Sequence, residues 1–106
     1  MAATNPQWVI CTYQVKKGRQ RAFEALLARH WKTLKRLKLV HAKSRPQYFR
    51  GQDPKGPVFV EIFAWLNEKA PDLAHHSPEV MAIWEPMMKL CRDMRFPHVE
   101  RFIPKA

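Results

Sequence analysis

The spacing of hydrophobic and polar positions changes several times along the chain, and each change marks a new structural element. Trp8 to Val15 is an apolar run rich in β-forming residues, which predicts a first strand. Apolar side chains then recur at three- and four-residue intervals, the spacing of one helical face. They are Phe23, Leu26, Leu27, His30, Leu34 and Leu37. The chain is therefore predicted to begin with a strand followed by a long helix.

Two further strands and a second helix are predicted in the rest of the chain. Ala42 to Arg50 and Pro57 to Leu66 read as strands joined by a turn-like stretch at 51–56. Ser77 before Pro78 is a favourable helix start. A helical stripe follows at Val80, Trp84, Met87, Cys91 and Met94, and His98 to Ile103 closes the chain as a short strand. Because Pro86 lacks an amide donor, we expect this helix to be kinked or split near Glu85.

The resulting order of elements, βαββαβ, predicts an α+β ferredoxin-like fold within a single domain, residues 1–106. In this fold two helices cover one face of a four-stranded antiparallel sheet. The third strand is apolar on both faces, whereas a half-solvated strand should alternate. Since two helices cover only one face, the other needs a cover, and a second copy of the chain would supply it. We therefore expect a homodimer.

The formal net charge of +10 is concentrated in one part of the chain. Positions 16–50 carry twelve Lys and Arg residues against the single acid Glu24. This basic surface is interpreted either as a solvated face that keeps the protein soluble or as an attraction for an anionic partner. The chain has no apolar run near the roughly 20 residues that span a bilayer and no secretion signal at its start, so we expect a cytoplasmic protein without membrane contact. Cys11 and Cys91 are expected to be free thiols.

A resemblance to a known family rests on Trp65 at the end of the third strand, on Ala74-His75 and on Ser77-Pro78 opening the second helix. In topology and in these motifs the chain resembles the antibiotic biosynthesis monooxygenase-like dimeric α+β barrels. The resemblance implies a dimeric barrel and a cofactor-independent monooxygenase acting on an aromatic or polyketide-like substrate. Glu61 stands where the quinone-forming members place an Asn. The haem-degrading branch is disfavoured because its first-strand Asn and second-helix His are missing.

The candidate site residues come from the strand and helix faces that point toward the predicted core. Glu61, Phe63 and Trp65 share one strand face. The predicted catalytic residues are Glu61, His75 and Trp65, and the predicted pocket-lining residues are His30, Phe63, His76, Trp84 and Met87. In an apolar cavity, desolvation would suit Glu61 to proton transfer. The alternative is that Glu61 faces a dimer interface and pairs with Arg45 or Arg101, and that His30 is a hydrogen-bonded core histidine.

Other kinds of site find little support. With three glycines the chain has no phosphate-cradling loop or dinucleotide fingerprint, and adjacent His75 and His76 point in different directions, so no cofactor and no metal are expected. RNA-recognition domains share the βαββαβ order, but their stacking aromatics are mostly missing, which makes nucleic acid an unlikely partner. The expected ligand is a small aromatic or acyl-type molecule. A non-catalytic ligand-binding or interaction protein remains the alternative.

Overall fold

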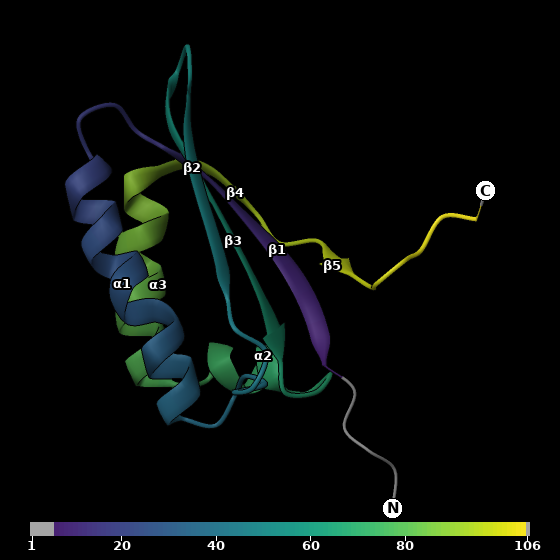
Figure 1. The fold of residues 1–106 in the computed structure, drawn as a ribbon. Helices are drawn as coiled ribbons and strands as arrows, with labels where there is room; N and C mark the ends of the chain where they lie inside the picture. Colours follow the sequence, from purple (N-terminus) through teal and green to yellow (C-terminus); the bar gives the residue numbers. More distant parts are fainter. Residues whose placement is uncertain (1–5, 106) are drawn as a thin grey trace, which may run out of the picture.

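The computed structural model describes residues 6–105, which form one antiparallel sheet with helices on one of its faces (Figure 1). The elements follow in the order β1 (Gln7–Val15), α1 (Gln20–Arg36), β2 (Gln47–Asp53), β3 (Gly56–Trp65), α2 (Ala70–His75), α3 (Pro78–Leu90), β4 (Cys91–Arg95) and β5 (His98–Val99). The strand order is β2-β3-β1-β4, with the short β5 also paired to β1. This arrangement confirms the predicted ferredoxin-like fold.

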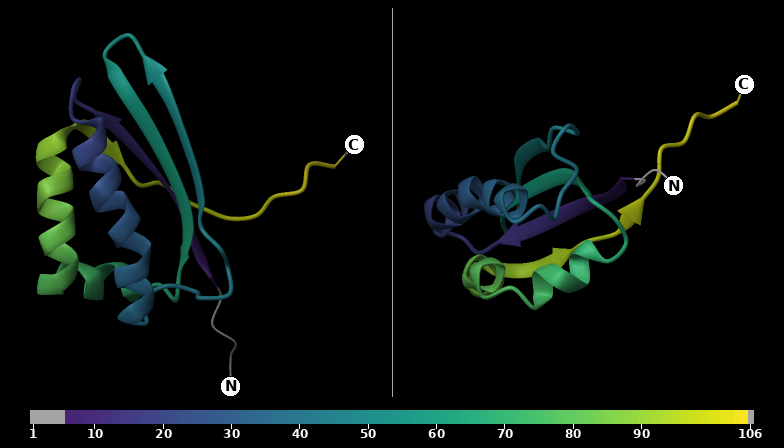
Figure 2. Two further views of the ribbon diagram at one scale, coloured as in Figure 1. Left: turned by 60° about the vertical axis from the view of Figure 1, so that its left-hand side comes forward. Right: turned by 90° about the horizontal axis from the view of Figure 1, so that it is seen from below.

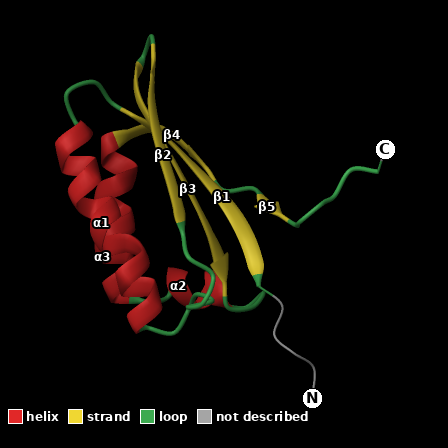
Figure 3. Ribbon diagram, in the orientation of Figure 1, coloured by secondary structure: helices red, strands yellow, loops and turns green. Residues whose placement is uncertain are grey.

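Helices α1 and α3 lie side by side against the sheet, and Figures 2 and 3 show the opposite face without a helix. On α1 the predicted apolar stripe is the buried face, made by Phe23, Leu27, His30 and Leu34. On β1 and β3 alternate residues point toward these helices, as the two-residue period of a strand requires. The core therefore lies between the sheet and the helices, and the site residues of both strands face into it.

The start of α3 agrees with the sequence, but its end does not. Ser77 is the N-cap, and its Oγ accepts a hydrogen bond from the amide of Val80 at 3.3 Å. The helix is one element from Pro78 to Leu90 with Pro86 inside it, so it is not split near Glu85, and the kink stays a prediction. The prediction that Cys91 and Met94 belong to this helix is wrong, because the backbone turns extended at Cys91 and begins β4. Both residues continue the helical spacing of the apolar stripe, so the sequence pattern does not indicate where the helix ends.

The turn of the β2–β3 hairpin is shorter than expected, and β2 begins at Gln47 rather than at Ala42. Its strands run to Asp53 and from Gly56, so the turn is confined to positions 54–55. Asp53 Oδ1 accepts a hydrogen bond from the amide of Lys55 at 2.8 Å. Gly56 adopts φ of +145°, and a Cβ there would lie 2.6 Å from the carbonyl oxygen of Val15. Glycine is therefore required where the hairpin packs against the end of β1.

The remaining sequence predictions concern thiols and membrane helices. Cys11 and Cys91 are both buried free cysteines, as expected. Within residues 6–105 no helix has the length and apolar character needed to cross a membrane.

Candidate functional site

The cavity between the sheet and helices α2 and α3 has a volume of about 550 Å³. Six of the predicted site residues line it: His30, Phe63, Trp65, His75, Trp84 and Met87. The other walls come from β1, α2, α3 and the chain around β4, with Val9, Cys11, Tyr13, Pro71, Met81, Met88, Met94, Phe96 and His98. No Asp, Glu, Lys or Arg is among these lining residues. The cavity therefore suits a neutral, largely apolar molecule.

Behind one wall of the cavity lies a fully buried carboxylate, Glu61, in the middle of β3. Tyr13 donates its hydroxyl to Glu61 Oε1 at 2.7 Å. The Nδ1 atom of His30 lies 2.9 Å from Oε1 and 3.1 Å from Oε2. The pairing of β1 with β3 puts Cys11 opposite Glu61, so Tyr13 reaches the carboxylate from the diagonal position. Three elements, β1, β3 and α1, thus bring their polar groups together inside an apolar core.

The second hydrogen bond of His30 fixes the position of its proton. Trp84 Nε1 lies 2.7 Å from His30 Nε2. An indole N–H is a donor only, so Nε2 must accept, and the imidazole proton resides on Nδ1. His30 is thus a neutral imidazole that donates from Nδ1 to Glu61. The carboxylate in turn accepts from His30 and Tyr13, which compensates part of the cost of burying it.

The neighbouring acidic groups are held in their protonated forms. Burial, and then the negative charge of Glu61, raise the pKa of the Tyr13 hydroxyl well above its usual range. The same two causes, in the same order, raise the pKa of the Cys11 thiol and of the Tyr48 hydroxyl. None of these three groups is an anion near neutral pH. Within the network, His30 lines the cavity, and Nε2 is its nitrogen that is not engaged with Glu61.

The structure corrects the alternative interpretation of Glu61. The carboxylate points toward the helices and pairs with His30, so an ion pair with Arg45 or Arg101 on the other face is wrong. Arg45 is exposed, and Arg101 lies over the ring of Trp8, 5.8 Å from its centroid. The physical reason is the strand period, which puts Glu61 on the same face as Phe63 and Trp65. Glu61 does not itself line the cavity and contacts it through His30 and Tyr13.

The predicted residues His75 and Trp65 lie in an aromatic cluster around Trp84. The ring of His75 lies 4.8 Å from that of Trp84, and Trp65 packs edge-on against the same indole at 6.4 Å. His76 does not join them. Its Nδ1 donates to the carbonyl of Asp72 at 2.8 Å and its side chain is exposed, because consecutive residues at a helix end point in different directions. The prediction that His76 lines the cavity is therefore corrected.

Sequence reasoning missed Tyr13 as a site residue. The two-residue period of the strand was the available signal, because it puts Tyr13 on the same inner face of β1 as Val9 and Cys11. Phe96 and His98, which also line the cavity, carried no such signal, since they follow the element whose boundary was misjudged.

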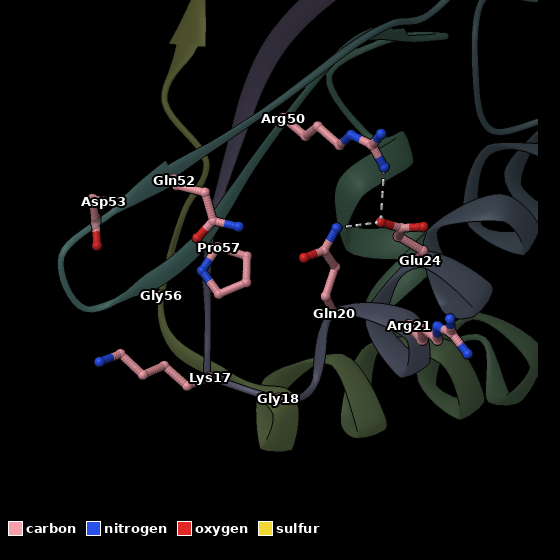
Figure 4. A pocket seen from close by; sticks show the side chains of 10 residues that line it. All are labelled: Lys17, Gly18, Gln20, Arg21, Glu24, Arg50, Gln52, Asp53, Gly56 and Pro57. Carbon is pink, nitrogen blue, oxygen red and sulfur yellow. Dashed lines mark hydrogen bonds and ion pairs between the residues drawn. The ribbon is translucent and has the colours of Figure 1, made fainter.

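A second, more open concavity of about 740 Å³ lies between the start of α1 and the β2–β3 hairpin (Figure 4). In it, Arg50 and Gln20 converge on the carboxylate of Glu24, at 3.2 and 2.9 Å. Lys17 and Arg21 lie at its edge. Its ionisable side chains are exposed or partly exposed, whereas His30 and Glu61 at the inner cavity are buried. Among residues 6–105 no three His, Cys, Asp or Glu side chains are placed to hold a metal ion. We therefore assign the candidate site to the inner cavity.

Comparison with known proteins gives structural matches only. No protein-family model matches the chain, and no curated protein is a significant match. SnoaB, a cofactor-independent oxygenase from Streptomyces nogalater, is 16% identical with a TM-score of 0.70, covering 96% of this chain and all of its own, 100%. A structure described as an antibiotic biosynthesis monooxygenase is 16% identical with a TM-score of 0.73, covering 92% of this chain and 99% of its own.

PA3566 from Pseudomonas aeruginosa is 17% identical with a TM-score of 0.71, covering 97% of this chain and 100% of its own. These likenesses confirm the resemblance to the antibiotic biosynthesis monooxygenase-like family at the level of the fold. Because one fold carries many chemistries, the activity has to be argued from the side chains of the cavity.

Proposed function

We propose that this chain, which has the fold of antibiotic biosynthesis monooxygenase structures, binds a small aromatic or acyl-type molecule in its inner cavity and oxidises it without a cofactor. The observation that carries the proposal is the His30–Glu61 pair at 2.9 Å, set in the wall of an otherwise apolar cavity of about 550 Å³. The neutral imidazole supplies a proton acceptor, and the apolar walls supply the binding energy. The oxygenase named among the structural matches supports this choice of reaction.

The first step is removal of a proton from the bound molecule. His30 Nε2 accepts the proton of a ring hydroxyl, and the resulting imidazolium is stabilised by the Glu61 carboxylate at Nδ1. Glu61 is thus a positioning residue, because it acts through His30. Trp65 and His75 pack around the ring of the substrate and hold it beside the base.

The second step uses the electron-rich phenolate as the reductant of molecular oxygen. One oxygen atom bonds to a ring carbon and the other leaves as water, together with the hydroxyl hydrogen and the hydrogen of that ring carbon. A phenol and dioxygen thus give a quinone and water, and the substrate supplies all the electrons. The His30 imidazolium returns its proton to the leaving oxygen, so the protein ends in its starting state.

Oxygen uptake tests this proposal. We expect the purified protein, after treatment with a metal chelator, to consume dioxygen when supplied with fused-ring phenols of two to four rings. A His30→Gln variant should lose about 100-fold or more of the rate, since Gln cannot take up the proton. His41→Gln is the matched control, because His41 lies outside the cavity and bonds Ser44 at 2.9 Å. Equal uptake by the His30→Gln variant would refute the role of His30.

Ligand binding without turnover is the second candidate function. It is favoured by the hydrogen bond between Trp84 and His30 Nε2, which occupies the atom that a base needs. The same apolar cavity would then hold a small molecule for transport or sensing. Tight binding of fused-ring phenols with no oxygen uptake would identify this function.

We further propose that a second copy of the chain covers the outer face of the sheet. Trp8, Ile10, Val60 and Ile62 are half-buried there, without a helix over them. Phe102 and Ile103, beyond β5, are 79% and 86% exposed. This apolar surface supports a homodimer. The two free thiols support a reducing compartment such as the cytoplasm.

A further inference from the structure

The lone pair of His30 Nε2, which the proposed chemistry requires, is occupied in this structure. Trp84 Nε1 donates to it at 2.7 Å, while Nδ1 is engaged with Glu61 at 2.9 Å. An imidazole whose lone pair accepts such a bond cannot at the same time accept a proton from a ligand. The proposed base is therefore capped, and the cap must leave before His30 reacts.

The side chain of Trp84 is held in a way that allows it to leave. It is partly exposed, it lines the cavity, and its contacts with His75 and Trp65 are edge-to-face ring contacts. The indole N–H of Trp84 donates its hydrogen bond to His30. A rotation of the indole into the adjacent cavity thus costs one hydrogen bond and a rearrangement of ring contacts.

The backbone beneath Trp84 is also less constrained than the rest of α3. Pro86 lies inside the helix and has no N–H to donate to the carbonyl of Ala82. Trp84 stands in the middle of the turn that lacks this hydrogen bond. This turn therefore has one backbone hydrogen bond fewer than an uninterrupted helical turn.

From these contacts we infer that Trp84 is a displaceable cap, and that a ligand reaches His30 only by replacing the indole N–H with a hydrogen-bond donor of its own. This inference rests on the proposed function of the cavity and adds a requirement to it. An apolar ligand without a donor would leave a buried acceptor unsatisfied if it displaced Trp84. Sites built around a hydrogen bond discriminate strongly against analogues that cannot make it.

The walls of the cavity narrow the ligand class further. No Asp, Glu, Lys or Arg lines them, so no side chain of these four types offsets the desolvation of an ionised ligand. The ligand that fits is therefore neutral when it enters and carries one hydroxyl or N–H on an apolar ring system. Trp84 is the residue that selects for this group.

A matched pair of probes tests the inference: 2-naphthol, which has a donor, and 2-methoxynaphthalene, which has the same rings without it. We expect calorimetry to show that 2-naphthol binds at least tenfold more tightly. In a Trp84→Phe variant the cap is absent, so the affinity for 2-naphthol should rise several-fold and that for the ether should change little. Trp31→Phe is the control, because Trp31 Nε1 has no hydrogen-bond partner among residues 6–105 and the residue lies outside the cavity.

Nuclear magnetic resonance of the unmodified protein gives a second readout, in which the Trp84→Phe variant serves only to assign one resonance. The four tryptophans give four indole N–H resonances, and that of Trp84 is identified by its loss in the Trp84→Phe variant. The Trp84 resonance should move upfield with 2-naphthol, as its bond to His30 breaks, and stay in place with the ether. Equal affinities for 2-naphthol and 2-methoxynaphthalene, with an unmoved Trp84 resonance, would refute the role of Trp84 as a cap. The proposal that the cavity binds small molecules would still hold. Binding of neither probe would remove both proposals.

Discussion

His30 Nδ1 and Glu61 Oε1 lie 2.9 Å apart although the two residues are separated by 31 positions in the chain. One stands on the buried face of α1 and the other on the inner face of β3. Neither side chain has appreciable exposure, so the pair depends on the packing of the helix against the sheet. The chemistry of the cavity is therefore coupled to the integrity of the core.

Replacing Glu61 by Gln should affect both stability and turnover. The amide keeps the size of the carboxylate but directs N–H groups at Tyr13 or His30, which are themselves donors. We expect a loss of roughly 1–3 kcal/mol in the free energy of unfolding, measured by urea denaturation. Oxygen uptake should also fall, because the imidazolium loses its anion. Glu24→Gln, at a solvated position on α1, is the control. Unchanged stability and uptake in the Glu61→Gln variant would contradict the assigned role.

The stability of the protein should decrease steeply at alkaline pH. Burial, and next the charge of Glu61, raise the pKa of Tyr13 in the folded state, whereas an unfolded tyrosine ionises near pH 10. The folded state then binds more protons than the unfolded state, so the stabilising contribution is complete below about pH 9 and is lost as the pH rises past 10.

Above pH 10, the free energy of unfolding of a Tyr13→Phe variant should fall less steeply than that of the original protein. The difference should be about 1.4 kcal/mol per pH unit, the slope that one proton contributes. Denaturation curves between pH 8 and pH 11 measure the difference. Tyr48 contributes in the same direction, because burial and Glu61 also raise its pKa. Parallel pH profiles for the original protein and the Tyr13→Phe variant would show that Tyr13 ionises equally in both states.

The two glycines of the β2–β3 hairpin should differ sharply in their tolerance of alanine. A Cβ at Gly56 would lie 2.6 Å from the carbonyl oxygen of Val15, and φ there is +145°. We expect Gly56→Ala to cost about 1–3 kcal/mol or more in thermal or urea denaturation. At Gly51 no atom of the described part of the chain lies within 4 Å of the added Cβ, so Gly51→Ala should be neutral to slightly stabilising. Equal effects would show that the hairpin does not press on β1.

The proposed dimer predicts a solution mass of about 25 kDa, twice the 12.6 kDa of the chain. Light scattering should give this mass at both low and moderate salt, because an interface formed by apolar burial is insensitive to the screening of charges by salt. Ile62→Lys on the outer sheet face should shift the mass toward that of one chain. Ala28→Lys adds the same charge on the exposed face of α1 and is the control. A single-chain mass for the unmodified protein would refute the dimer.

Much of the fold and part of the site were predictable from local patterns. The two-residue period put Glu61, Phe63 and Trp65 on one face, and the helical period put His30 among core positions. Both patterns are local, and the structure follows them. The partner of Glu61 was not predictable, because it depends on the β1–β3 register and on how α1 is rotated over the sheet.

The end of α3 illustrates a different reason for failure. Cys91 follows Met87 at helical spacing, and no glycine or proline stands at the junction. The chain nevertheless turns extended there, because β4 completes its pairing with β1. Strand pairing thus overrides a local pattern that contains no helix-termination signal. The cavity residues that follow β4, Phe96 and His98, were therefore not predicted.

The polar network of Tyr13, His30 and Glu61 has a further consequence for protein engineering. Apolar side chains of similar size at these positions would fill the same space without any charge to bury, and such replacements are often neutral or stabilising. A chain selected for folding alone would have no use for the network. Replacing Tyr13, His30 and Glu61 by Phe, Leu and Met would keep the fold and the cavity but remove the polar network. A different reactive group could then be introduced into the same cavity.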